Sequence, residues 1–197
     1  MKKHAPATLR NREAIAKVLA EELPPEGTVL EVASGSGEHV IYLAERFRSL
    51  IWQPSDPDPD ALASISAYLA EYSYDNLRAP LALDACGDDW PLARVDAIFC
   101  ANMLHISPWA SACGLFERAA LLLNGGDPLI LYGPYLEPDI ETQPSNLAFD
   151  ASLKARNSSW GLRLLSDVDA LAEGAGFVRT ARRTMPANNL MLTYRRR

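Results

Sequence analysis

The sequence is poor in several features that mark whole classes of protein. It contains only three cysteines, Cys86, Cys100 and Cys113, with no Cys-x-x-Cys pair and no cysteine–histidine cluster. Disulfide frameworks and zinc modules need such pairs, so we expect free thiols, no bound metal and a reducing, cytoplasmic location. No apolar run approaches the roughly 18 residues of a membrane-spanning helix, and Met1 to His4 leads into no signal-peptide core. We therefore expect no membrane partner.

An excess of positive charge is also missing. The 197 residues carry 19 Lys and Arg against 25 Asp and Glu, which gives a net charge of −6. Binding to nucleic acid needs a positive field, so we expect no nucleic-acid partner and favour a small-molecule substrate. Hydrophobic residues make up 48% and charged residues 22%, as in globular proteins, and the length is that of one domain, residues 1–197. No signal indicates an oligomeric state.

Short apolar runs alternate with helical patterns along most of the chain. The expected strands cover residues 28–33, 50–54, 80–83, 95–101, 129–132, 177–183 and 190–194. The expected helices cover residues 11–23, about 37–47, 59–72 and 109–123, with a last helix capped by residues 166–169 and ending at Gly174 or Gly176. Strands that alternate with helices indicate parallel βαβ units with helices on both faces of the sheet. The last two strands are expected to pair as an antiparallel hairpin.

Two segments interrupt this alternation or precede it. Residues 133–159 are rich in Pro, Asn, Ser and Asp and are too long for a simple connection, so residues 133–165 are predicted to form a substrate-side insertion or lid. Residues 1–27 are predicted to form an N-terminal helix and flap, in which Asn11 and Arg12 close over a bound ligand.

A glycine-containing turn follows the first expected strand. Gly35 and Gly37 allow a ligand to approach the backbone, and the helix that follows offers free N–H groups and a positive dipole end. Glu31 precedes the turn, and its carboxylate would repel a pyrophosphate in a partly buried cleft. An acid at this position suits a ligand with a cationic group, such as the amino group of S-adenosylmethionine.

Two further acids follow the next two expected strands. Asp56 lies 21 residues after Gly35, where it can accept hydrogen bonds from ribose hydroxyls of a methyl donor or of a nicotinamide cofactor. Val40 stands where a dinucleotide fingerprint has its third glycine, which favours the methyl donor. Asp84 either accepts from an adenine amine or caps a local turn. Ligands of open α/β sheets lie beyond the carboxyl ends of the strands, so we expect these acids to cluster there with Asn102.

With these residues in place, the sequence resembles class I S-adenosylmethionine-dependent methyltransferases, and most closely the methyltransferase-like protein twenty-six family. The similarity extends over nearly the whole chain and is carried by residues 29–39, 52–56, 101–109, 132–135, 145–150, 160–161 and 185–189. It implies a Rossmann-like α/β fold with a mainly parallel seven-stranded sheet, and S-adenosylmethionine as the cofactor. The expected cofactor-binding residues are Glu31, Ala33, Ser34, Gly35, Gly37, Asp56, Asp84, Ala85, Asn102 and Met103.

The sequence departs from the broader superfamily at two points. Ala33 replaces the first glycine of the acid-x-Gly-x-Gly-x-Gly pattern, and a methyl group is tolerable there if its φ is negative. Ala101 to Leu104 replaces the Asn-Pro-Pro-Tyr motif of enzymes that methylate the amino groups of nucleic-acid bases, which disfavours that activity.

Methyl transfer is an in-line displacement, so the protein mainly has to align donor and acceptor. His105 is the candidate general base, or it holds its loop by local hydrogen bonds; both interpretations stay open. Polar and aromatic groups near the cleft are candidates for binding the acceptor, although each also has a structural interpretation. These candidates are Asn11, Arg12, His105, Trp109, Tyr132, Tyr135, Asn146, Trp160, Asn188 and Asn189.

Three functions are compatible with these residues. The first is a methyltransferase with a small-molecule acceptor, of which a protein acceptor is a variant. The second is a nicotinamide-dependent oxidoreductase. The third is a methyltransferase fold that binds S-adenosylmethionine or a partner without turnover.

Overall fold

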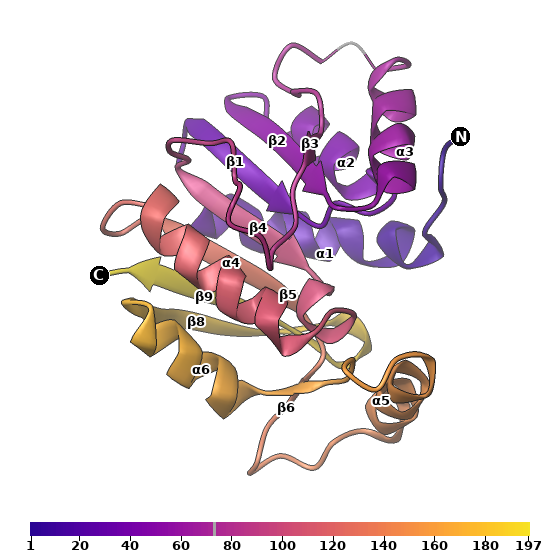
Figure 1. The fold of residues 1–197 in the computed structure, drawn as a ribbon, viewed down its shortest axis with the longest axis vertical. Coiled ribbons are helices and arrows are strands. Elements are labelled where there is room, and N and C mark those ends of the chain that lie inside the picture. The colour runs from indigo at the N-terminus through magenta and orange to yellow at the C-terminus, as the bar shows by residue number, and fades with distance from the viewer. Residues whose placement is uncertain (73) are drawn as a thin grey trace.

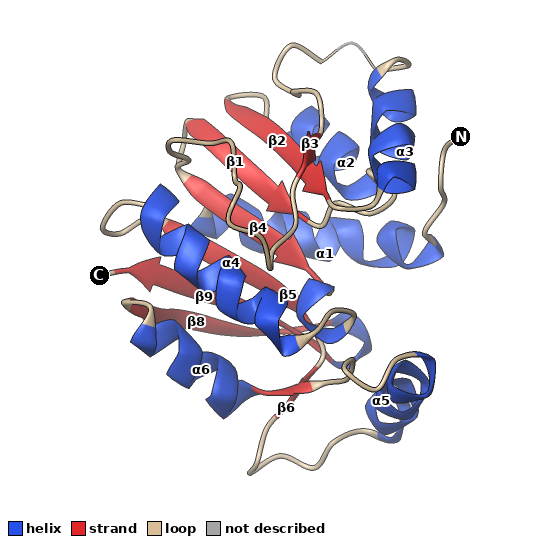
Figure 2. Cartoon of the chain, viewed as in Figure 1, coloured by secondary structure: helices blue, strands red, loops and turns tan. Residues whose placement is uncertain are grey.

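A seven-stranded sheet organises the computed structural model, which describes residues 1–72 and 74–197 (Figures 1 and 2). The strand order is β3-β2-β1-β4-β5-β9-β8. The strands are β1 (Gly27–Val32), β2 (Leu50–Asp56), β3 (Leu81–Ala82), β4 (Ala97–Ala101), β5 (Pro128–Gly133), β8 (Phe177–Met185) and β9 (Asn189–Arg196). Pairs from β3 to β5 are parallel, whereas β9 is antiparallel to both β5 and β8. The predicted mainly parallel sheet with a C-terminal hairpin is therefore confirmed.

Helices cover both faces of the sheet. Successive residues of the central strands point to opposite faces, and they are apolar on each face, so both faces have to be buried. The helices are α1 (Pro6–Glu22), α2 (Glu38–Arg46), α3 (Pro59–Leu69), α4 (Trp109–Leu122), α5 (Pro144–Arg156) and α6 (Leu165–Gly174). On one face, Val29 of β1 packs in a buried cluster with α1 and α2. On the other face, the next residue, Leu30, packs in a cluster with α4 and α6. No helix within the described residues is long and apolar enough to span a membrane.

The order of the strands reverses between β1 and β4. From β1 the chain proceeds outward through β2 to β3, and from β4 it proceeds in the other direction to β5. Ligands of such sheets bind beyond the carboxyl ends of the strands at this switch point. The arrowheads of the parallel strands point toward the side of the molecule on which α5 lies (Figure 1). The turns after β1 and β4 therefore flank the expected ligand crevice.

Most elements differ from the sequence-based expectation by one to three residues at their ends. Helix α1 begins at Pro6 instead of Asn11, since a proline is well accommodated in the first turn of a helix. Strand β3 contains only Leu81–Ala82. Helix α6 begins at Leu165, and Leu164 at its N-cap makes no side-chain capping bond. Helix α3 ends at Leu69, three residues before the expected end.

The segment 133–165 is the largest of these differences. Residues that were expected to form a loop or lid contain helix α5 and a small parallel sheet of β6 (Tyr135–Leu136) and β7 (Arg163–Leu164). Only Asn146 and Leu153 of α5 are buried. The helix therefore lacks the apolar stripe that periodicity detects.

Candidate functional site

The turn after β1 combines two glycines with different surroundings. Gly35 has φ +57° and Gly37 has φ +89°, both in the left-handed region that favours glycine. A Cβ added to Gly35 would meet nothing within 4 Å, whereas one added to Gly37 would lie 3.0 Å from the Ile65 side chain and 3.1 Å from the Ile65 Cα atom. Gly37 therefore allows α2 and α3 to pack closely. Gly35 faces open space that a ligand can enter.

Ala33 corrects one expectation about this turn. A methyl group was expected to be tolerable there with a negative φ, but the Ala33 φ is +58°. A left-handed conformation costs about 1–2 kcal/mol for a residue other than glycine. The turn holds this strain at a position where the superfamily pattern has glycine.

Hydrogen bonds from the end of β2 fix the turn. The Asp56 carboxylate accepts from the Gly35 N–H at 2.8 Å and from the Asp58 N–H at 3.0 Å. The Ser34 N–H donates to the Ser55 carbonyl at 2.8 Å, and the Ser55 hydroxyl donates to the Glu31 carbonyl at 2.8 Å. Asp56 thus positions the glycine turn, a contact that sequence spacing alone did not predict.

Glu31, which precedes this turn, has a buried carboxyl group that lacks a hydrogen-bond partner at one oxygen within the described residues. Its side chain is 2% exposed, and Oε2 has no hydrogen-bond partner among the residues that the structure describes. Burial raises the pKa of Glu31 to about 8, against the opposing effect of a Ser34 hydrogen bond, and the Asp56 charge raises it further. With this pKa the carboxyl is mainly protonated at pH 7 in the free protein, so the anionic side chain expected beside a cationic ligand stays a prediction.

The turns after β3 and β4 complete the edge of the crevice. The Asp84 carboxylate accepts from the Cys86 N–H at 2.9 Å, which is the turn cap considered above, and Asp84 is exposed. Ala85 is buried, and a Cβ added to Gly114 of α4 would overlap its carbonyl. Gly114, which sequence reasoning missed, therefore allows α4 to approach this loop.

Asn102 follows β4 in the left-handed region, with φ +63°. Its N–H donates to the Tyr132 carbonyl at the end of β5 at 2.7 Å. A short 3-10 helix, Met103–His105, comes next, and Met103 is buried. The left-handed residue thus turns the chain at the switch point, where a ligand of the sheet would lie.

His105 is enclosed beyond β4. Its ring is 1% exposed and lies edge-on to Tyr135, with 4.8 Å between the ring centroids. A Cβ added to Gly133 would overlap Nε2, so the backbone of Gly133 covers the ring. Neither ring nitrogen has a partner within residues 1–72 and 74–197. Burial lowers the pKa of His105 to about 3, as does the charge of Arg163. His105 is therefore a neutral, weakly basic group, and its role as a general base stays a prediction.

Arg163 holds the loop after β4 in place. Its Nε donates to the Leu104 carbonyl at 2.8 Å, and its Nη2 donates to the Ser107 and Ser159 carbonyls at 2.7 and 2.9 Å. Its guanidinium also lies 5.6 Å from the Trp109 ring centroid. No local pattern indicated the role of this residue, because two of its three partners, Leu104 and Ser107, lie 59 and 56 residues earlier in the chain.

Asn11 and Arg12, which were predicted to close over a bound ligand, contact different parts of the protein. Asn11 Oδ1 lies 2.9 Å from His39 Nε2, and a hydrogen bond with Asn11 opposes the effect of burial, which raises the pKa of Tyr132. The contact between Asn11 and His39 therefore connects α1 with α2. Arg12 instead lies over the Tyr42 ring, 4.7 Å from its centroid.

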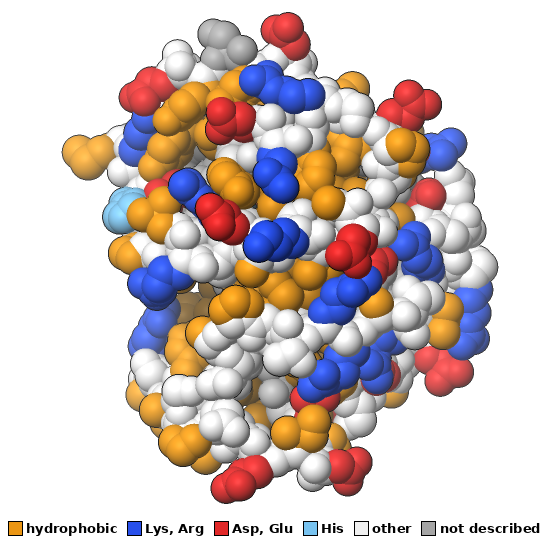
Figure 3. All heavy atoms as spheres, turned by 180° about the vertical axis from the view of Figure 1, so that it is seen from behind, with side chains coloured by type: hydrophobic (Ala, Val, Ile, Leu, Met, Phe, Trp, Pro, Cys, Tyr) orange, Lys and Arg blue, Asp and Glu red, His pale blue; other side chains and the backbone are white. Residues whose placement is uncertain are grey.

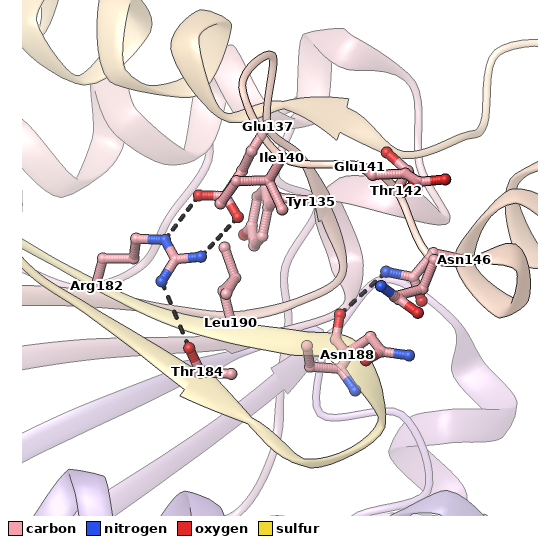
Figure 4. A pocket seen from close by; sticks show the side chains of 12 residues that line it. Tyr135, Glu137, Ile140, Glu141, Thr142, Asn146, Arg182, Thr184, Asn188 and Leu190 are labelled. Carbon is pink, nitrogen blue, oxygen red and sulfur yellow. Dashed lines mark hydrogen bonds and ion pairs between the residues drawn. The ribbon is translucent and has the colours of Figure 1, made fainter.

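A cavity of about 170 Å³ lies between the β6–α5 segment and the β8–β9 hairpin (Figure 4). Four of the predicted acceptor residues line it: Tyr135, Asn146, Asn188 and Asn189. Sequence reasoning missed other lining residues, among them Glu137, Ile140, Glu141, Arg182, Thr184 and Leu190. Trp109 and Trp160 are not among the residues that line this cavity, and Arg156 lies 4.9 Å from the Trp160 ring centroid. The cavity brings together four of the ten expected acceptor residues.

Comparison with solved structures places this fold among methyltransferases. The mitomycin 7-O-methyltransferase MmcR superposes with a TM-score of 0.82 at 17% identity, over 97% of this chain and 54% of that one. The S-adenosylmethionine-dependent methyltransferase SibL gives 0.76 at 19%, over 96% and 55%. A protein from Bacillus halodurans C-125 gives 0.73 at 15%, over 94% and 98%. The chain thus spans about half the length of the first two proteins, and its fold is Rossmann-like, as in class I methyltransferases.

A family model covers almost the whole sequence. It matches residues 2–196, which include the glycine turn, the loops after β3 and β4, and the residues that line the cavity. The chain belongs to this family, which is described as "Protein of unknown function (DUF938)".

Proposed function

We propose that this protein is an S-adenosylmethionine-dependent methyltransferase with a small-molecule acceptor. Two observations at the turn after β1 carry the proposal: a Cβ on Gly35 would meet no atom within 4 Å, and Oε2 of buried Glu31 has no partner among the residues that the structure describes. A buried polar atom without a partner is costly, so natural proteins keep one mainly where a ligand or water completes it. The methyltransferase fold supports the same conclusion.

The residues around this space fit the parts of the cofactor. Glu31 would ionise and pair with the cationic amino group of the methionine moiety. The Gly35 turn would approach the ligand through its backbone, and Asp56 would accept from the ribose hydroxyls. The remaining oxygen of Asp84, with the backbone of Ala85, would face the adenine. Asn102 and Met103 would line the crevice from β4.

The chemistry asked of the protein is modest. When bound, S-adenosylmethionine supplies an electrophilic methyl group. The residues of this chain have to exclude water and hold the acceptor in line with the methyl group. This positioning of the two reactants is the main catalytic effect that the protein has to supply. The cavity beside α5 is the proposed acceptor site, with the segment 133–165 as its cover. His105, behind Tyr135, would take a proton only from an acceptor that reaches its ring.

The location of this enzyme is inferred from its unpaired cysteine pattern, and the class of its substrate from its net charge. We infer a cytoplasmic enzyme that does not act on nucleic acid, since the net charge is −6. On the face shown in Figure 3, Lys and Arg side chains are interspersed with Asp and Glu. Kinship with the methyltransferase-like protein twenty-six family, whose motifs the sequence resembles, is part of this proposal.

Calorimetric titration with S-adenosylhomocysteine, the demethylated product, tests the proposal. We expect binding, and we expect Asp56→Ala to weaken it by about 1–3 kcal/mol, because ribose hydroxyls and the Gly35 N–H lose their acceptor. Asp58→Ala is the matched control. That carboxylate caps α3 and pairs with Lys3, so its loss lowers stability but leaves the affinity unchanged.

Three outcomes would count against the proposal. Binding of NAD(H) in place of S-adenosylhomocysteine would favour the oxidoreductase. No binding of either ligand at millimolar concentration would reject both. Equal affinities of the Asp56→Ala variant and the unmodified protein would place the ligand elsewhere.

A further inference from the structure

Three asparagines that line the cavity beside α5 are held by hydrogen bonds from their amide nitrogens. Asn146 Nδ2 donates to the Asn188 carbonyl at 3.0 Å, and Asn188 Nδ2 donates to the Ser145 hydroxyl at 3.1 Å. Asn189 Nδ2 donates to the Pro186 carbonyl at 2.9 Å. Asn189 Nδ2 also donates to the Ala187 carbonyl at 3.2 Å, so it uses both of its N–H groups, whereas Asn146 and Asn188 each use one of two. Their carbonyl oxygens accept no hydrogen bond within the described part of the chain.

Burial makes this pattern informative at Asn146. Its side chain belongs to a residue that is only 8% exposed, yet it lines the cavity and leaves its oxygen unengaged (Figure 4). An amide held by its nitrogen, with its oxygen free beside a cavity, is arranged to accept from a ligand.

The charged residues around the cavity also favour a ligand that donates hydrogen bonds over an anionic one. Arg182 donates to both oxygens of Glu137, with distances of 2.7 Å from Nε and 2.6 Å from Nη2 (Figure 4). This bidentate pair engages the guanidinium. Glu141 is exposed and has no ion pair with any residue that the structure describes. The charged lining residues therefore sum to one negative charge, and an anionic ligand would have to compete with Glu137 for Arg182.

The remaining walls are apolar and set the size of the ligand. Tyr135, Ile140 and Leu190 line the cavity opposite the amides. Its volume of about 170 Å³ is close to that of engineered cavities of about 150 Å³ that hold benzene. The site therefore suits one small ring or a branched chain of similar volume, with a polar head.

We propose that this cavity binds a small organic amine, with its body against the apolar wall and its ammonium group among the Asn146, Asn188 and Asn189 oxygens. An ammonium group carries three donors and no acceptor, which complements free amide oxygens and the charge of Glu141. The identification of this amine as the methyl acceptor rests on the proposed function. The binding itself does not. Transfer would require the ammonium to lose one proton to solvent, after which its nitrogen lone pair bonds the methyl carbon as the carbon–sulfur bond of the donor breaks.

A second cavity, of about 360 Å³, is a competing site for a cation. It is lined by Glu38, Glu45 and three tyrosines, Tyr42, Tyr68 and Tyr72, among other residues. Its aromatic faces are already covered by cations of the chain. Arg12 lies 4.7 Å from the Tyr42 centroid, and Lys2 Nζ lies 4.3 Å from that of Tyr68. A ligand amine would have to displace these groups.

Three probes of nearly equal size test the inference by NMR-detected titration at pH 7: benzylamine, benzyl alcohol and benzoate. Benzylamine is expected to bind most tightly and benzoate most weakly. Glu141→Gln is expected to weaken benzylamine about two- to fivefold, the effect of a partly exposed charge pair. Glu45→Gln removes the same charge from the second cavity and is expected to leave the affinity unchanged.

Benzoate that binds as tightly as benzylamine would overturn the inference. So would a loss of affinity in Glu45→Gln that equals or exceeds the loss in Glu141→Gln. S-adenosylhomocysteine is titrated separately on the same samples. Its binding without any benzylamine binding would reject this inference alone, and benzylamine binding without it would reject the proposed function alone.

Discussion

Replacing Gly35 with alanine is expected to lower the affinity for S-adenosylhomocysteine at least tenfold, or about 1.4 kcal/mol. The new methyl group meets no protein atom within 4 Å, so it projects into the space that the ligand needs. The φ of +57° also strains any side chain there, at about 1–2 kcal/mol of stability. Calorimetry measures the first effect and urea unfolding the second.

Gly126→Ala separates these two effects. Gly126 has φ +88°, and a Cβ there also meets nothing within 4 Å, but the residue lies in the loop before β5. We expect a similar loss of stability in both variants and a loss of affinity only in Gly35→Ala. If both variants bind equally well, the space before Gly35 is not the ligand site.

Glu31→Gln is expected to make the protein more stable while weakening its ligand binding. The pKa of Glu31 is raised from 4.5 to about 8 in the folded state, so folding takes up a proton between these pH values. Stability from this group is therefore complete below pH 4.5 and falls as pH rises toward 8. At pH 7 the cost is about 3 kcal/mol, and an uncharged glutamine of the same shape avoids it.

The measurement is urea unfolding of both proteins from pH 5 to 8. The gain from Glu31→Gln should be small at pH 5 and should grow with pH. Glu22→Gln is a contrasting control: Glu22 is also buried, but it pairs with Arg183 and Arg195, so its loss should be destabilising. A Glu31→Gln variant that is less stable at pH 7 would mean that Glu31 is ionised and paired in the free protein.

The sequence predicted the sheet well because its strands are short apolar runs bounded by turn residues. Residues 95–101 and 129–132 include most of β4 and β5, and the hairpin of β8 and β9 was anticipated. Helix α5 was missed because its stability does not come from an apolar stripe. It contributes only two buried side chains, and one of them is the polar Asn146.

Within the candidate site, the sequence predicted the positions of residues better than their protonation and their backbone conformation. The positions of Gly35 and Asp56 follow from local spacing, since Gly35 lies in the turn after β1 and Asp56 ends β2. The protonation of Glu31 depends on burial by neighbouring elements, and the φ of Ala33 on hydrogen bonds to β2; neither is encoded locally. The pair of Glu137 and Arg182 joins residues 45 positions apart, so no motif reveals it.

The central claim is that a cationic ligand group converts buried, protonated Glu31 into its charged partner. Titration with S-adenosylhomocysteine at pH 7, in buffers of different ionisation enthalpy, measures the protons exchanged on binding. We predict the release of close to one proton in the unmodified protein, and none in Glu31→Gln. Binding without proton release, or with proton uptake, would contradict the account.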